Sequence, residues 1–328
     1  MNYLVTGATG YVGAHLVQFL IKQGHTVNAL CRSEEKAALI RQQGVVVYFG
    51  DILNKKSLNS AAAGCDGIFH LAAYAKVWAK NPKIYFDLNV TGTENVLQAA
   101  IQEKIKKVVV TSTAGVFGTS DGEAITESYV RNRDFFNEYE SSKTYCESRI
   151  KDYVIGGLHV VIVSPTRIYG PYLFGSPGSV TKLITTYING IGALIPGKGD
   201  KLGNYVFIDD VVCGHVSAMQ KGVSGRTYIL GGENSDYINF FSTLRAVSGK
   251  NKMMIKIPYW ISSCIAHIQL SMANIFGRNP LITPKWLVKG KYDWEVSSLR
   301  AITELDFKIT PLQTGLQKTV EWVNQIYP

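Results

Sequence analysis

Three glycines near the amino terminus constrain the fold of this chain more than any other feature. An apolar run that ends at Val5 is typical of a buried strand, and apolar residues from Val12 onward recur at helical spacing. Gly7, Gly10 and Gly13 lie in the turn between these elements, where they permit a sharp change of direction and a close approach of an anion to the backbone amides. The positive end of the following helix would face that anion. The spacing therefore predicts a strand, a turn and a helix that bind the pyrophosphate of a dinucleotide.

Composition and cysteine spacing exclude several classes of protein. The chain has 328 residues, of which 46% are hydrophobic and 18% are charged, as in a globular protein with a large core. Its five cysteines form neither a CxxC pair nor a metal-ligand spacing, and their odd number argues against a disulfide framework. We therefore expect no metal site and a reducing compartment. Because the first expected strand begins almost at Met1, a secretory leader has no room, and we expect a cytoplasmic protein.

The net charge of +9 does not by itself indicate a nucleic-acid partner. Basic residues occur throughout the chain, and no zinc-finger, RNA-recognition or basic-helix pattern accompanies them. An anionic cofactor is the simpler explanation for the positive charge. One region is asymmetric, because residues 245–291 include eight Lys or Arg and no Asp or Glu.

Apolar runs and helical patterns alternate over the first half of the chain. We expect strands at residues 26–30, 45–48, 67–71, 107–111 and 160–163, and helices at residues 34–41, 82–101 and 139–154. Such an alternation produces a parallel sheet with helices on both faces. The predicted fold class is α/β, with a Rossmann-type doubly wound parallel sheet.

The regular alternation ends near Pro165, where two prolines and a glycine interrupt the pattern. We predict a dinucleotide-binding domain over residues 1–164. Residues 165–328 are expected to form a smaller, irregular and mainly substrate-binding part, with residues 205–220 returning to the main body.

Two stretches of this second part carry specific expectations. Residues 175–203 are rich in glycine and loop-forming residues, and we expect them to be irregular. Asp209 and Asp210 could be catalytic carboxylates, but we expect them to cap the helix that continues through Met219.

The end of the second expected strand bears on cofactor choice. Folds that use NAD normally carry an acidic residue there to hold the ribose 2′-hydroxyl, whereas this chain has Arg32 and Ser33. A guanidinium offers a fixed donor fork to phosphate oxygens. This favours NADP(H), with NAD(H) as the alternative cofactor. Arg32 could equally be a solvated surface residue.

Hydroxyl and ionisable residues follow the fifth expected strand. Ser112 and Thr113 lie at its carboxyl end, where ligands bind in open α/β sheets, although such residues also end strands for local reasons. Tyr139 and Lys143 have the i, i+4 spacing that puts both on one face of a helix. A nearby ammonium favours phenolate, so we expect Lys143 to lower the pKa of Tyr139 toward the range of a proton donor or acceptor.

These motifs occur in a fixed order along the chain. They are Thr6-Gly7-Ala8-Thr9-Gly10-Tyr11-Val12-Gly13, Gly50-Asp51, His70-Leu71-Ala72-Ala73, Asn89 with Gly92-Thr93, Tyr139 with Lys143, Tyr169-Gly170-Pro171 and Phe207-Ile208-Asp209-Asp210-Val211. In order and spacing the chain resembles the extended short-chain dehydrogenase/reductase (NAD-dependent epimerase/dehydratase) superfamily. Further stretches are similar to its dihydroflavonol 4-reductase-like and farnesol dehydrogenase-like branch: Trp78, Thr119-Ser120-Asp121-Gly122, Gly231-Gly232-Glu233-Asn234 and Pro280-Leu281-Ile282-Thr283-Pro284.

The resemblance implies a role for each matching residue. Tyr139 would be the acid/base, Lys143 would orient the ribose, and Thr113, with Ser112 as the alternative, would be the hydroxyl partner. The expected cofactor-binding set is Gly7, Thr9, Gly10, Tyr11, Val12, Gly13, Arg32, Ser33, Asp51, Ile52, Leu71, Ala72, Ala73, Tyr139, Lys143, Pro165 and Ile168. The expected substrate-binding set is Tyr74, Trp78, Phe117, Tyr169 and Tyr172. Many sugar-processing relatives have an Arg at the position of Ser164, which disfavours a sugar substrate here.

Three functions are compatible with these residues. The first is an NAD(P)(H)-dependent oxidoreductase that interconverts a carbonyl and an alcohol by hydride transfer on a largely apolar small molecule. The alternative is a sugar-nucleotide epimerase or dehydratase, which would use the same residues and retain its cofactor. A non-catalytic dinucleotide-sensing protein is disfavoured, because a sensor needs no acid/base.

The apolar substrate is suggested by residues 258–276. Trp260, Ile261, Cys264, Ile265, Ile268, Met272, Ile275 and Phe276 recur there at helical spacing, which fits either core or a pocket wall or entrance. Together with the surrounding basic region, this segment could also rest transiently on an anionic membrane surface. The expected partners are therefore a lipophilic small molecule, a membrane surface and, in a homodimer, a second copy of the chain, with no nucleic acid. The sequence leaves the oligomeric state open.

Overall fold

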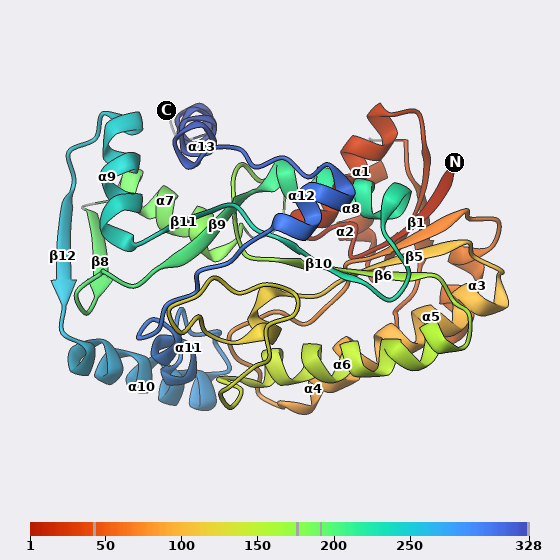
Figure 1. The fold of residues 1–328 in the computed structure, drawn as a ribbon, viewed down its shortest axis with the longest axis horizontal. Coiled ribbons are helices and arrows are strands. Elements are labelled where there is room, and N and C mark those ends of the chain that lie inside the picture. The colour runs from red at the N-terminus through yellow and green to blue at the C-terminus, as the bar shows by residue number, and fades with distance from the viewer. Residues whose placement is uncertain (42–43, 175–176, 191, 327–328) are drawn as a thin grey trace.

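A seven-stranded parallel sheet forms the centre of the computed structural model, which describes residues 1–41, 44–174, 177–190 and 192–326 (Figure 1). The strand order is β10-β6-β5-β4-β1-β2-β3, as expected for a doubly wound sheet. The strands are β1 (Asn2–Thr6), β2 (Thr26–Cys31), β3 (Val46–Phe49), β4 (Gly67–His70), β5 (Lys107–Thr111), β6 (Val160–Pro165) and β10 (Thr227–Leu230). The predicted α/β fold class is confirmed.

Helices cover both faces of this sheet (Figure 1). One face is covered by α1 (Tyr11–Lys22), α2 (Glu34–Arg41), α8 (Ile208–Lys221) and α12 (Leu299–Leu305). The other is covered by α3 (Lys55–Ala62), α5 (Gly92–Gln102) and α6 (Glu138–Ile155). Apart from the edge strand β3, the apolar strand residues are buried on both sides, which explains why these strands read as nearly continuous apolar runs.

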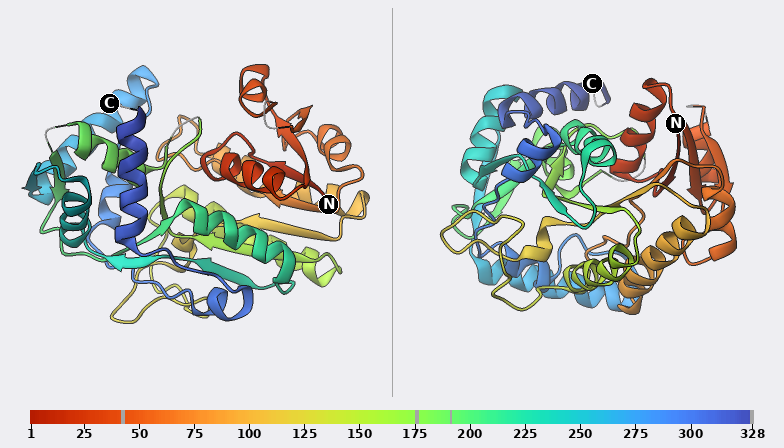
Figure 2. Two further views of the ribbon diagram at one scale, coloured as in Figure 1. Left: turned by 90° about the horizontal axis from the view of Figure 1, so that it is seen from above. Right: turned by 45° about the vertical axis from the view of Figure 1, so that its right-hand side comes forward.

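The second part of the chain packs beside the carboxyl edge of the main sheet (Figure 2). It has a three-stranded sheet in the order β11-β9-β7 and a parallel pair β12-β8. Its strands are β7 (Arg167–Tyr169), β8 (Gly192–Pro196), β9 (Gly203–Phe207), β11 (Glu233–Ser235) and β12 (Met253–Ile257). Its helices are α7 (Ser179–Asn189), α9 (Tyr237–Ser248), α10 (Tyr259–Phe276), α11 (Pro284–Lys289) and α13 (Leu312–Ile326).

Several local predictions differ from the structure. The stretch 175–203, expected to be irregular, contains α7 and β8, because Val180, Ile184 and Tyr187 bury one helical face in the core of the second part; residues 175, 176 and 191 lie outside the described residues. Helix α3 was not predicted, although Asn54 caps it by accepting from the backbone N–H of Ser57. Strand β10, which follows α8, also joins the main sheet.

The aspartate pair at the start of α8 does not cap the helix. Asp209 and Asp210 lie in its first turn, and Phe207 occupies the N-cap position without a side-chain hydrogen bond. The Asp210 carboxylate instead accepts from the backbone N–H and the hydroxyl of Thr310, both at 2.7 Å. It therefore ties α8 to the segment before α13.

Candidate active site

The glycine turn between β1 and α1 is packed too tightly for any side chain at two of its positions. Gly7 has φ +74°, and a Cβ there would lie 2.7 Å from the backbone nitrogen of Ala72. A Cβ on Gly13 would lie 2.1 Å from the carbonyl oxygen of Gly7. Gly10 is the N-cap residue of α1, so the first amides of the helix face a turn in which two of the positions have no side chain. This cradle fits the pyrophosphate of a dinucleotide.

The residues expected near the adenosine end follow β2 and β3 at the same edge of the sheet. The Arg32 guanidinium lies 3.9 Å from the Asp51 carboxylate and is 62% exposed. Ser33 accepts from the backbone N–H of Lys36 at 3.5 Å and so begins α2. The Ile52 side chain is buried against the helix at Gly92, which leaves only its backbone to meet a ligand.

Tyr139 and Thr113 are brought together by α6 and the turn after β5. Asn137 caps α6 by accepting from the backbone N–H of Glu140 at 3.0 Å. The Thr113 side chain lies close enough to the Tyr139 hydroxyl to favour its ionised form. Ser112 is turned elsewhere, because its hydroxyl donates to the half-buried carboxylate of Glu147. Of the two hydroxyls that the sequence left open, Thr113 is therefore the one beside Tyr139.

Burial dominates the ionisation of these groups. It raises the pKa of Tyr139 to about 12, with the nearby Thr113 side chain acting in the opposite direction. Burial also lowers the pKa of Lys143, whose ammonium donates to the backbone carbonyl of Thr111 at 2.8 Å. The pKa of Tyr139 is therefore shifted in the direction opposite to the one expected from the sequence, because desolvation of the phenolate is the largest effect.

Glu147 was not identified from the sequence, although its spacing from Lys143 is again i, i+4. Burial raises its pKa to about 7, against the opposing effects of the Ser112 hydrogen bond and the Lys143 charge. The three residues Tyr139, Lys143 and Glu147 therefore line one side of α6.

Asn89 was recognised only as part of a motif, and its role becomes visible in the structure. It lies in a π-helical turn (η1, Asp87–Thr91) between α4 (Lys83–Phe86) and α5, a distortion often found at functional sites. Its side chain accepts from the backbone N–H of Tyr74 at 2.7 Å and donates to the Ser142 hydroxyl at 2.9 Å. It thereby joins the loop after β4 to the first turn of α6.

His70 belongs to a second buried network. Its ring nitrogens bond to the hydroxyls of Thr6 at 2.7 Å and Thr93 at 2.9 Å. Burial lowers the pKa of His70 to about 3, so the ring is neutral near pH 7. This histidine joins β1, β4 and α5 rather than transferring protons.

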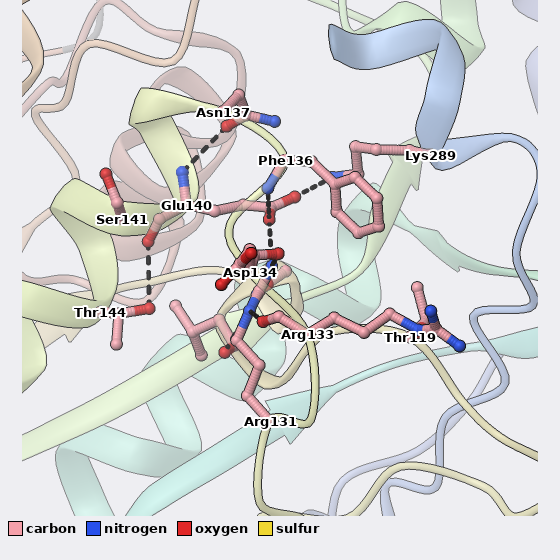
Figure 3. Close-up of polar contacts among 12 residues, drawn as sticks. Thr119, Arg131, Arg133, Asp134, Phe136, Asn137, Glu140, Ser141, Thr144 and Lys289 are labelled. Carbon is pink, nitrogen blue, oxygen red and sulfur yellow. Dashed lines mark hydrogen bonds and ion pairs between the residues drawn. The ribbon is translucent and has the colours of Figure 1, made fainter.

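A buried ion cluster follows directly after Tyr139 (Figure 3). The fully buried Glu140 carboxylate pairs with Arg131 at 2.8 Å and with Lys289 of α11 at 2.5 Å. It also accepts from the backbone N–H of Phe136 at 3.3 Å. The loop 131–136 and α11 are therefore held against the start of the helix that carries Tyr139.

The expected substrate residues fall into two groups. Tyr74 donates to the Trp78 carbonyl at 3.0 Å, and the Trp78 indole N–H donates to Asn274 of α10 at 3.2 Å, so both lie in the loop after β4. The Tyr172 ring packs edge-on against Trp322 of α13, 4.8 Å between centroids. Phe117 and Tyr169, in contrast, are buried in the core.

Phe117 and Tyr169 are core residues, which contradicts their expected substrate role. Phe117 is buried with Ile125 and Val296 in a small apolar cluster. Tyr169 is fully buried against Phe207, and its hydroxyl donates to the Leu312 carbonyl at 3.5 Å. Neither side chain is available to a ligand.

The remaining expected cofactor residues line the boundary between the two parts of the chain. The Tyr11 hydroxyl donates to the Gly170 carbonyl at 2.9 Å. Thr9 lies in the glycine turn, Val12 and Ile168 pack partly buried against the adjoining cores, and Pro165 ends β6. Leu71, Ala72 and Ala73 follow β4, facing the same edge of the sheet.

The chain is similar in sequence to a known family of enzymes. The sequence model of the NAD dependent epimerase/dehydratase family matches residues 3–231. A putative dihydroflavonol 4-reductase of Synechocystis sp. is 28% identical over 326 residues, covering 98% of this chain and 94% of the relative. A 2-alkyl-3-oxoalkanoate reductase of Shewanella oneidensis is 35% identical over 227 residues, covering 65% of this chain and 56% of the relative.

A solved structure extends the likeness to the whole fold. UDP-glucose 4-epimerase of Thermotoga maritima, solved with UDP-glucose, has a TM-score of 0.82 and 22% identity and covers 100% of both chains. Identity at this level shows a shared fold alone. With the family match over most of the chain, the chain belongs to the NAD dependent epimerase/dehydratase family, the extended short-chain dehydrogenases/reductases, and is an NAD(P)-dependent enzyme.

Proposed function

We propose that this enzyme interconverts a carbonyl and an alcohol on a largely apolar small molecule, with NADP(H) as the favoured cofactor. The observation that carries the proposal is the proximity of the Tyr139 and Thr113 side chains, with the buried Lys143 one turn further along α6. A phenol and a second hydroxyl that converge in this way can both hydrogen-bond one substrate oxygen.

Each residue has a distinct part in the proposed reaction. Tyr139 donates its phenolic proton to the carbonyl oxygen during reduction and accepts it back during oxidation. Thr113 donates a hydrogen bond to the same oxygen and fixes its position. Lys143 favours the phenolate that remains after proton transfer. The nicotinamide supplies or accepts the hydride when it is bound.

The part of the chain after residue 164 is proposed to supply most of the substrate-binding walls. Tyr74 and Trp78 add to them from the loop after β4. The reductase relatives support a carbonyl substrate, and the oxoalkanoate named for one of them has an alkyl chain, which supports an apolar body. A sugar-nucleotide epimerase or dehydratase remains the second candidate, because the fold of UDP-glucose 4-epimerase spans the whole chain.

The test is cofactor absorbance near 340 nm, measured while aldehydes, ketones and alcohols of increasing chain length are added. We expect net cofactor consumption, with kcat/KM rising up to about fourfold per methylene, the equivalent of about 0.8 kcal/mol, until the pocket is full. A nucleotide sugar converted without net consumption would support the epimerase instead. A chain-length profile that stays flat would contradict the apolar substrate.

Arg32→Ala tests the cofactor preference. The guanidinium is exposed beside Asp51, where a 2′-phosphate could accept its hydrogen bonds. We expect NADP(H) binding to weaken by about 1.5–3 kcal/mol, the range for a hydrogen bond to a charged group, and NAD(H) binding to change much less. Calorimetric titration of both cofactors gives the comparison, and Arg245→Ala, remote in the second part, is the control. Equal losses for both cofactors would mean that Arg32 does not read the phosphate.

A further inference from the structure

Helix α10 presents its large apolar side chains to solvent instead of to the protein. Trp260 is 69% exposed, Ile268 60%, Ile275 73% and Phe276 66%. The predicted helix is confirmed, but its apolar stripe is not core. The residues of α10 that are buried are small: Ser262, Ala266 and Ala273.

The exposed residues form one continuous surface, here called the outer face of α10. At about 100° per residue they occupy roughly 160° of the helix circumference, opposite the small buried residues. The face comprises the half-buried Ile261 and the exposed Trp260, Cys264, Ile265, Ile268, Met272, Ile275 and Phe276. Leu281, 83% exposed, lies just beyond the carboxyl end of the helix. Figure 1 shows α10 at the periphery of the molecule, below β12. An apolar surface of this kind marks an interaction site.

Positive charge surrounds the outer face. No acid occurs between residues 245 and 291. A cavity of about 660 Å³ opens at the amino-terminal end of α10, lined by Pro258 and Tyr259 of the helix start and by Lys198, Lys256 and Lys291. Within the described ranges of the chain, none of these three lysines has an ion-pair partner. The cavity also contains Asp200, and its fourth lysine, Lys201, is paired with Asp293 at 2.9 Å.

Apolar side chains next to unpaired cations define the chemistry of the partner. A second copy of this chain would bring like charges together across a two-fold axis, which opposes association. An anionic lipid surface satisfies both features, because acyl chains receive the apolar side chains and phosphates attract the lysines. No helix in the part of the chain that the structure describes has the length and hydrophobicity needed to cross a membrane.

We propose that the outer face of α10 docks onto the surface of an anionic phospholipid bilayer, with Lys198, Lys256 and Lys291 near the lipid phosphates. Trp260 is exposed and follows Tyr259 of the cavity, so its indole would reach the membrane interface, the region that indoles prefer. The hydrogen bond from Trp78 to Asn274 sets α10 against the loop after β4. Resting on the proposed function, this contact places the substrate loop next to the source of a lipophilic substrate.

Vesicle flotation with the full chain tests the docking, without substrate or cofactor. We expect binding to vesicles of phosphatidylcholine with 30% phosphatidylglycerol, weaker binding in high salt, and little binding to phosphatidylcholine alone. The double variant Ile268→Ser with Ile275→Ser should reduce the bound fraction at least tenfold. Lys256→Gln and Lys291→Gln should each weaken binding about fivefold, the equivalent of about 1 kcal/mol per cation.

The control variant is Ile155→Ser, which removes an 86% exposed isoleucine from the end of α6 and should bind as wild type. Equal binding of wild type and the double variant would overturn the proposal. So would a dimer, detected by light scattering, that the double variant dissociates, because it would identify a second copy as the occupant. Loss of vesicle binding leaves carbonyl turnover testable in solution, so the two proposals fail separately.

Discussion

Tyr139→Phe is expected to lower kcat/KM for carbonyl reduction by about 10²–10⁴-fold, the usual contribution of a general acid. The change removes the one oxygen that lies near Thr113 and leaves the half-buried ring in place. With the phenol absent, the carbonyl oxygen loses its proton donor, while the glycine cradle and Lys143 are untouched. Cofactor affinity should therefore change by no more than about tenfold, because at most one hydrogen bond is lost.

Steady-state kinetics and cofactor titration on the same preparations provide the measurement. Tyr145→Phe is the matched control, since Tyr145 lies in the same helix with its side chain 51% exposed, and it should retain wild-type kinetics. Thr113→Val should also lose activity but to a smaller degree, because it removes a hydrogen bond and not the proton donor. If Tyr139→Phe keeps more than a tenth of wild-type activity, Tyr139 is not the acid.

The sequence predicts the dinucleotide-binding half well because its signals are local. The glycine spacing, the apolar runs and the helical periodicity each report on a few consecutive residues, and β1, β2, α2 and β5 lie within a residue of their predicted bounds. The right-handed parallel arrangement then follows from general rules of chain connection. The choice between Ser112 and Thr113 is not local, since it depends on Glu147, 35 residues away from Ser112.

The second part is harder to predict because tertiary contacts decide its structure. Its glycine-rich stretch looks irregular, yet α7 forms there through burial of residues such as Ile184 and Tyr187. Tertiary contacts also decide which side chains can reach a ligand. Tyr169 has the residue type and the motif of a ligand-binding position, but the core formed by Phe207 and α13 encloses it. Periodicity shows that residues 259–276 are amphipathic without showing which face is buried.

Glu140 connects the two parts of the chain and directly follows Tyr139 in α6. A small shift of the Glu140 backbone would therefore displace the Tyr139 side chain. The Glu140 carboxylate is fully buried, and its two cations come from the loop before α6 and from α11 in the second part (Figure 3). The Lys289 ammonium also lies over the rings of Trp286 and Trp294, at 4.7 and 4.5 Å from their centroids. Such an arrangement holds α11 in a fixed position relative to the catalytic helix.

Glu140→Ala is therefore expected to reduce the free energy of unfolding by about 3–5 kcal/mol, the range for removing one partner from a buried ion pair. The loss is large because Arg131 and Lys289 stay buried without a counter-charge. Denaturant unfolding measures the change. Glu138→Ala is the matched control: its carboxylate pairs with Lys285, whose side chain is 59% exposed, and its loss should cost less than about 1 kcal/mol.

The double variant Glu140→Ala with Lys289→Met separates ion pairing from a general loss of packing. If the uncompensated charge is the cause, removing Lys289 as well should recover part of the stability lost in Glu140→Ala, because one buried cation fewer lacks a partner. If the two losses simply add, packing and not charge is responsible. Recovery of stability without recovery of kcat would further show that Glu140 also positions the start of α6, since the methionine restores no tie between α11 and the residue after Tyr139.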